Sequence, residues 1–218
     1  MGCEMNESVG FLISVASYVP ESSYEDVVED FNAAKFPVLL ERRDPQVFAA
    51  LQYLMPTAIV VYLLKPYFEK FLSKMAEDHY DLCKAGVKKL WSRFASKDRS
   101  FLSHAIGTEG KIFETDLALE LSFVAVAADQ QRFSLLFPRS VSESEFEKAV
   151  GAFYLLIDQY DRDFQKSVPG RIASFGHAKH FQRVLTWSSS LERLVEVDVL
   201  ESNRQKKLVT SEIPRLNG

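Results

Sequence analysis

The apolar positions at the start of the chain first follow the period of a strand and then that of a helix. From Gly10 to Val19 apolar and small residues alternate between two faces, which predicts a β-strand that ends before Pro20. Ser22 followed by Glu25 matches a helix capping box, and apolar residues then recur at helical spacing at Tyr24, Val27, Val28 and Phe31. A second strand is predicted at 36–41. This order predicts a β-α-β unit.

The next segment is apolar without any period. No charged side chain occurs from Pro45 to Leu64, and Asp44-Pro45 is a good helix start. We expect a helix there that continues as a charged amphipathic helix to about Phe94. Pro56 and Pro66 each remove a backbone hydrogen bond, so the region should divide into two or three helices.

An uncharged helix of this length has two common settings. As an ideal helix, residues 45–64 would extend about 30 Å, which is also the thickness of a bilayer core. However, Arg42, Arg43 and Lys65 flank the run at both ends and indicate no orientation. We therefore expect a helix buried inside the protein, and keep membrane insertion as the alternative.

The second half of the chain returns to clear periods. Residues 116–127 alternate, with Leu117, Leu121 and Phe123 on one face, and the run around Phe133 and Phe137 continues the pattern on a partner strand. This predicts a β-hairpin. Ser142 with Glu145 forms a second capping box before a strongly amphipathic helix.

Pro169-Gly170 interrupts the chain and divides it into two regions. We expect an α+β core domain at 1–168, in which a mostly antiparallel sheet, made of the N-terminal β-α-β unit and the central hairpin, packs against long, proline-interrupted helices. The C-terminal extension, 169–218, should contain a short helix at 178–187 and strands at 194–200 and 207–213. Arg204 to Lys207 should form the turn between those strands, which either extend the same sheet or stand apart.

Composition changes this picture little. The chain has 218 residues and a net charge of −4, which argues against nucleic-acid binding. Its two cysteines, Cys3 and Cys83, do not make a disulfide framework, so a reducing compartment is expected. No basic and then apolar N-terminal segment is present. We expect a cytoplasmic protein, with membrane association as the alternative.

Candidate chemistry is sparse. The turn at Gly107–Lys111 lacks the first glycine and the final hydroxyl of a phosphate-binding loop. His177 and His180 would share a helix face, but no third metal ligand is indicated. His79 and Cys83 lie one helical turn apart on a core-facing stripe without a nearby oxyanion donor. We therefore expect no enzyme activity, no cofactor and no metal site, although an enzyme with an unmarked site stays an alternative.

Charge is segregated along the chain, and this is the only feature that indicates a function. The first helix is acidic at Glu21, Glu25, Asp26, Glu29 and Asp30. The end of the long helical region is basic at Lys84, Lys88, Lys89 and Arg93. Such faces bind oppositely charged partners. We expect a non-catalytic interaction protein, of the adaptor or toxin-neutralising kind, that binds a protein partner through these helices. A membrane-active protein that uses 45–64 is the alternative.

Overall fold

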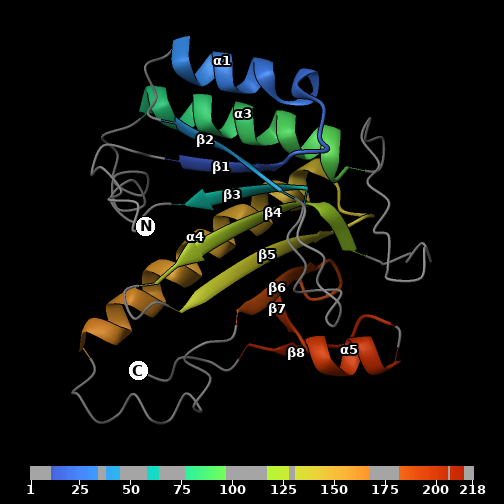
Figure 1. Ribbon diagram of the computed structural model, residues 1–218. Coiled ribbons are helices and arrows are strands. Elements are labelled where there is room, and N and C mark those ends of the chain that lie inside the picture. Colours follow the sequence, from blue (N-terminus) through green and yellow to red (C-terminus); the bar gives the residue numbers. More distant parts are fainter. Residues whose placement is uncertain are drawn as a thin grey trace.

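The computed structural model describes residues 11–33, 38–44, 58–63, 77–96, 117–127, 131–166, 182–205 and 207–213 (Figure 1). The strands are β1 (Phe11–Ala16), β2 (Val38–Arg43), β3 (Ile59–Leu63), β4 (Leu117–Val126), β5 (Arg132–Pro138), β6 (Arg183–Ser188), β7 (Arg193–Val197) and β8 (Thr210–Glu212). The helices are α1 (Glu25–Ala33), α3 (Glu77–Phe94), α4 (Glu143–Lys166) and α5 (Val199–Gln205), with a 3-10 turn η1 (Glu21–Ser23).

All eight described strands form one mixed sheet in the order β2-β1-β3-β4-β5-β6-β7-β8. Neighbours are parallel in β1/β2, β3/β4 and β5/β6 and antiparallel in the other four pairs. The predicted α+β class is confirmed, whereas the mostly antiparallel sheet is right only in part. Parallel neighbours require a crossover segment, and α1, α3 and α4 lie in the three segments that join the parallel pairs.

These three helices pack on the same face of the sheet. Their apolar sides share one core with alternate residues of the strands, among them Ile13, Ile59 and Phe123. The Trp91 ring of α3 stacks on the Phe146 ring of α4 with centroids 4.9 Å apart. Figure 1 shows α1 and α3 side by side at the β2 end of the molecule, while α4 crosses behind the central strands.

The other face of the sheet is also buried around β4 to β7, and a β-bulge changes which residues point to it. The register of β4 against β5 shifts between Ala118 and Ser122. Leu117 therefore packs in a second cluster with Val184 and Val197 near α5, whereas Leu121 belongs to the helix-side core. The strict alternation predicted for 116–127 placed Leu117 and Leu121 on one face and was wrong on that point. Between Ala118 and Ser122 the strand β4 advances four positions while β5 advances one, and this irregularity interrupts the alternation.

The predicted helix at 45–64 is wrong at its C-terminal end, where the chain forms the interior strand β3. Residues 45–57 and 64 lie outside the described ranges. Ala58, Ile59, Val60 and Val61 are nonetheless buried, as the helix hypothesis expected for this run. A strand buried on both faces is apolar at every position, so its sequence resembles a buried helix, and β-branched Ile and Val favour the strand.

No helix among the residues that the structure describes is long and apolar enough to cross a membrane. Residues 59–63 at the end of the uncharged run form the strand β3, so they are not part of a membrane-spanning helix of twenty residues.

The two predicted capping boxes have different outcomes. At the start of α4 the Ser142 backbone N–H donates to the Glu145 carboxylate at 2.9 Å, and the Glu145 N–H donates to the Ser142 hydroxyl at 3.3 Å. At Ser22 the chain forms η1 instead, and α1 begins only at Glu25. Glu25 is thus the first helical residue, and the predicted Ser22–Glu25 capping box is replaced by the 3-10 turn at Glu21–Ser23.

The C-terminal region was predicted least well. Residues 183–187 form the strand β6, not the end of a helix, and α5 replaces the predicted end of one strand and part of the turn at Arg204. Asp198 caps α5, since its carboxylate accepts the Glu201 N–H at 2.9 Å. The predicted strands at 194–200 and 207–213 are present in shorter form as β7 and β8, which continue the sheet beyond β6.

Candidate functional site

Helix α1 presents three distinct sides, because successive residues are rotated by about 100° on a helix of 3.6 residues per turn. Val27 and Phe31 are buried against the sheet and anchor the helix. Asp26 and Asp30 lie on the flank that faces α3. By the same rotation, Glu25 and Glu29 lie roughly opposite Val27 and Phe31, on the exposed side of α1 that faces away from the sheet.

The flank facing α3 is neutralised within the molecule. The Arg93 guanidinium donates to both carboxylate oxygens of Asp26, at 2.5 and 2.6 Å, and Lys89 Nζ donates to Asp30 at 2.5 Å. The hydrogen bond from Arg93 holds the pKa of Asp26 at about 2, below its ordinary 3.8. The hydrogen bond to Asp30 raises the pKa of Lys89.

The predicted acidic and basic faces are therefore partners of each other along the α1–α3 contact. Asp26 forms an ion pair with Arg93 and Asp30 forms one with Lys89, while Lys88 pairs with Glu143 of α4. Lys84 belongs to α3, but its side chain lies outside the described ones. The charged residues were found by sequence, whereas their pairing was missed, since the partners lie 59 and 67 positions apart.

Three glutamates of the predicted acidic site stay exposed. Glu21, Glu25 and Glu29 point to solvent, and the part of the chain that the structure describes offers none of them an ion pair. Arg42 of β2 lies near the start of α1, since its charge acts on Tyr24 together with those of Glu21 and Glu25. Its guanidinium donates to the Ser17 carbonyl at 3.4 Å. Glu21, Glu25 and Glu29 thus form an exposed acidic surface on η1 and α1, with the basic Arg42 near its start.

A second polar cluster lies in the sheet and was not singled out by sequence. Glu120 is 1% exposed, and its carboxylate accepts a hydrogen bond from Arg139 at 3.3 Å. Hydroxyl residues on several strands are buried as well, namely Ser14, Ser122, Ser134 and Thr186. Short polar side chains within otherwise apolar strand sequences could have indicated these buried polar positions. The Arg139 guanidinium supplies an ion pair for the buried Glu120 carboxylate.

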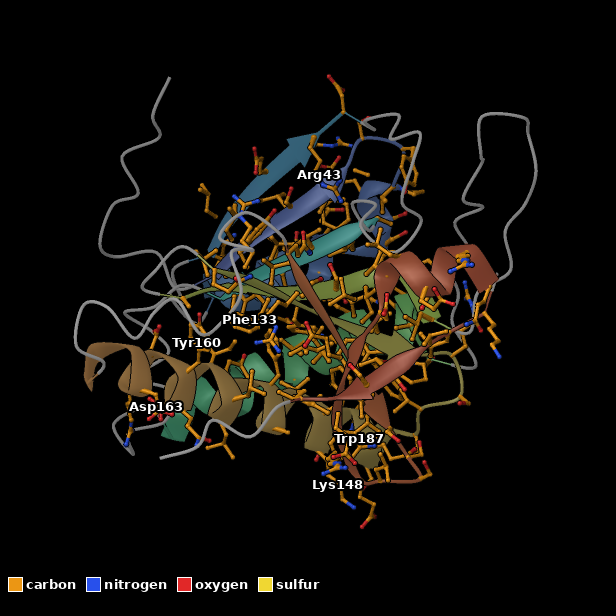
Figure 2. The ribbon with its side chains drawn as sticks, turned by 90° about the horizontal axis from the view of Figure 1, so that it is seen from below. Arg43, Phe133, Lys148, Tyr160, Asp163 and Trp187 are labelled. Carbon is orange, nitrogen blue, oxygen red and sulfur yellow. The ribbon has the colours of Figure 1, made fainter. Side chains whose placement is uncertain are left out.

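A third polar feature is the Arg43 side chain at the β2 end of the sheet. Figure 2 shows it at the opposite end of the molecule from Trp187 and Lys148. Burial lowers the pKa of its guanidinium, and its Nε and Nη2 atoms have no hydrogen-bond partner within the described structure.

Figure 2 also shows Tyr160 beside Phe133. The two rings meet edge to face with centroids 5.0 Å apart, and this contact fixes α4 on β5.

The other sequence candidates give no site that can be assessed. Gly107–Lys111, His177 and His180 lie outside the described ranges, as do the side chains of His79 and Cys83. Among the described residues, no group of three or more His, Cys, Asp or Glu side chains could hold a metal ion. The exposed glutamates of α1 and η1 are therefore the best-defined candidate for an interaction site.

No protein-family model matches the chain, and neither curated proteins nor solved structures show significant similarity to it.

Proposed function

We propose that this protein is a non-catalytic interaction protein that binds a basic protein partner through the exposed flank of α1. Its binding residues are Glu25 and Glu29, with Glu21 at the adjoining turn. The observation that carries the proposal is that these glutamates are exposed and have no ion pair in the described structure, although Asp26 and Asp30 on the same helix are fully engaged.

The setting of α1 supports this proposal in two ways. First, the helix is held rigidly, since Phe31 is buried and Asp26 forms a two-point contact with Arg93. A rigid site loses less conformational entropy when a partner binds. Second, uncompensated charges of one sign speed the approach of an oppositely charged partner and exclude partners of like charge.

The direct test is charge reversal at Glu25 and Glu29, with recovery of partners measured by quantitative mass spectrometry from an extract of the protein's own cells. We expect a partner retained by the wild type and reduced about tenfold or more with Glu25→Lys/Glu29→Lys, since each reversal replaces an attraction by a repulsion. Retention should also fall between about 0.1 M and about 1 M salt, where the screening length drops from about 10 Å to about 3 Å.

The matched control carries the same change in charge at a distant surface. Glu192 and Glu212 have side chains that are 76% and 73% exposed and lie near the other end of the sheet. Glu192→Lys/Glu212→Lys should retain the same partner. The proposal is wrong if a correctly folded Glu25→Lys/Glu29→Lys variant, as judged by circular dichroism, retains every partner of the wild type.

A further inference from the structure

We propose that a second copy of this chain covers the sheet face at β2, on the side away from the helices. Leu39, Glu41 and Arg43 of each copy would meet the same three residues of the other copy across a twofold axis. Helix α1 packs on the opposite face of the sheet, so this inference goes beyond the proposed function and does not depend on Glu25 and Glu29.

Strand β2 directs alternate side chains to opposite faces of the sheet. Val38 and Leu40 pack against the core that the helices share, so Leu39, Glu41 and Arg43 point to the other face. Leu39 is 45% exposed, Glu41 is exposed and Arg43 is partly buried. One face of this strand therefore presents an apolar, an acidic and a basic side chain in succession.

The apolar part of this surface extends across the neighbouring strands. Leu39 pairs with Leu12 of β1, and Leu12 pairs with Tyr62 of β3. Tyr62 pairs in turn with Val124 of β4, and directly paired residues share one face of a sheet. Exposure rises along this row from 5% at Val124 to 45% at Leu39. An exposed apolar patch rimmed by charged residues is typical of a protein–protein interface.

The two charged side chains of this surface are not neutralised within the described part of the chain. Neither Glu41 nor Arg43 has an ion pair there, and Arg43 Nε and Nη2 have no hydrogen-bond partner. Burial lowers the pKa of Arg43, while the charges of Tyr62, Tyr18 and Glu41 act in the opposite direction. A partly buried guanidinium without a counter-charge is unfavourable, so a carboxylate from outside the chain would stabilise Arg43.

The arrangement of the charges favours a second copy as the partner. Contacts across a twofold axis are reciprocal, so an interface that joins Glu41 of one copy to Arg43 of the other forms that ion pair twice. The surface is thus complementary to itself. A partner with charges of one sign would instead place a like charge against either Glu41 or Arg43, which is unfavourable.

Sedimentation equilibrium of the full chain tests for this dimer, over protein concentrations from about 1 μM to about 1 mM. We expect the wild type to dimerise within this range. Glu41→Lys and Leu39→Glu should each weaken dimerisation about tenfold or more, because they place a like charge opposite Arg43 or a charge in the apolar contact. Both residues are exposed, so the monomers should keep their fold, as judged by circular dichroism.

A charge exchange between two variants tests the reciprocal pairing. Glu41→Lys alone and Arg43→Glu alone should stay monomeric, because each would juxtapose like charges twice across the axis. Mixed in equal amounts, the two variants should dimerise with each other, because both contacts then join opposite charges. The matched controls are Glu192→Lys and Arg204→Glu, whose side chains are 76% and 81% exposed in the C-terminal region. Each should dimerise like the wild type.

A wild type that stays monomeric throughout the range overturns this inference, since solvent or another protein would then face the surface. A dimer that tolerates both Leu39→Glu and Glu41→Lys uses another contact and overturns it as well. These two variants decide the question if Arg43→Glu does not fold. If it folds, failure of the mixed variants to dimerise refutes the twofold pairing. None of these results depends on whether a partner requires Glu25 and Glu29.

Discussion

At the scale of single residues, the contact between α1 and α3 depends on a glycine. Gly86 of α3 faces Phe31 of α1, and a Cβ atom at position 86 would lie 2.4 Å from Cζ of that ring. Since Phe31 is 1% exposed, the ring has little room to move. The glycine that weakens α3 as an isolated helix thus allows α1 and α3 to approach closely enough for their ion pairs to form.

A pair of glycine substitutions tests this contact. Gly86→Ala should destabilise the protein by about 1–3 kcal/mol, because overpacking a core outweighs the gain in helix propensity. Gly151→Ala on α4, where nothing lies within 4 Å of the added Cβ, should instead stabilise it by about 0.5–1 kcal/mol. Urea unfolding measures both values. Stabilisation by both substitutions would show that Phe31 does not restrict position 86.

At the scale of elements, the α1–α3 contact joins an apolar layer to a row of ion pairs. Asp26 and Arg93 form a two-point contact whose geometry is more favourable than that of most surface pairs. The Asp26 side chain is 45% exposed, so solvent screens part of the interaction and the pair should contribute only about 1 kcal/mol.

The Asp26–Arg93 pair predicts a dependence of stability on pH. The pKa of Asp26 is about 2 in the folded protein against an ordinary 3.8, so its contribution is complete above about pH 4 and is lost as the pH falls toward 2. Asp26→Asn removes the ionisable group. We expect this variant to lose about 1 kcal/mol near pH 6 and to lose less stability than the wild type on acidification. Urea unfolding at several pH values measures the slopes.

Glu145 loses its charge over the same acidic pH range as Asp26, so it also contributes to the measured dependence of stability on pH. Hydrogen bonds from Ser189 and Ser142 lower its pKa to about 2 from 4.5. Its contribution also decreases as the pH falls, so Asp26→Asn should flatten the slope only in part. Equal slopes for the wild type and Asp26→Asn would contradict the assignment of Asp26 as an ionised, stabilising carboxylate.

At the scale of the whole molecule, stability should decrease from the centre of the sheet to its ends. The strands β4 and β5 are central in the sheet and bury nearly all of their described side chains. At the far edge, β8 has three residues, all exposed. Edge strands with few buried contacts open locally at a lower free energy than central strands.

Hydrogen exchange measured by mass spectrometry tests this gradient. Peptides from β4 and β5 should exchange most slowly, and those from β8 most quickly, because their amides open through local fluctuations rather than global unfolding. Similar protection of β8 and β4 would contradict the strand order of the sheet.

Sequence periodicity predicted the elements whose two faces differ in polarity. The strand at β1, the hairpin of β4 and β5, and α4 with its Ser142–Glu145 capping box were found in this way. The strand β3 was misassigned because Ile59 to Leu63 contains only apolar residues and tyrosine, so no period distinguishes strand from helix. Within the candidate site, the charged residues were predicted but the division between paired aspartates and exposed glutamates was not.

What the chain alone determined is local: alternation, capping and charge depend on residues within a few positions of each other, and their energies act before the fold is complete. Only the tertiary structure decided the rest, because it brought distant residues together. It ordered the strands, placed β3 between β1 and β4 inside the sheet, and joined Asp26 to Arg93 across 67 positions. All four residues of α1 are carboxylates, and the packing of α3 beside Asp26 and Asp30 determined that Glu25 and Glu29 stay exposed.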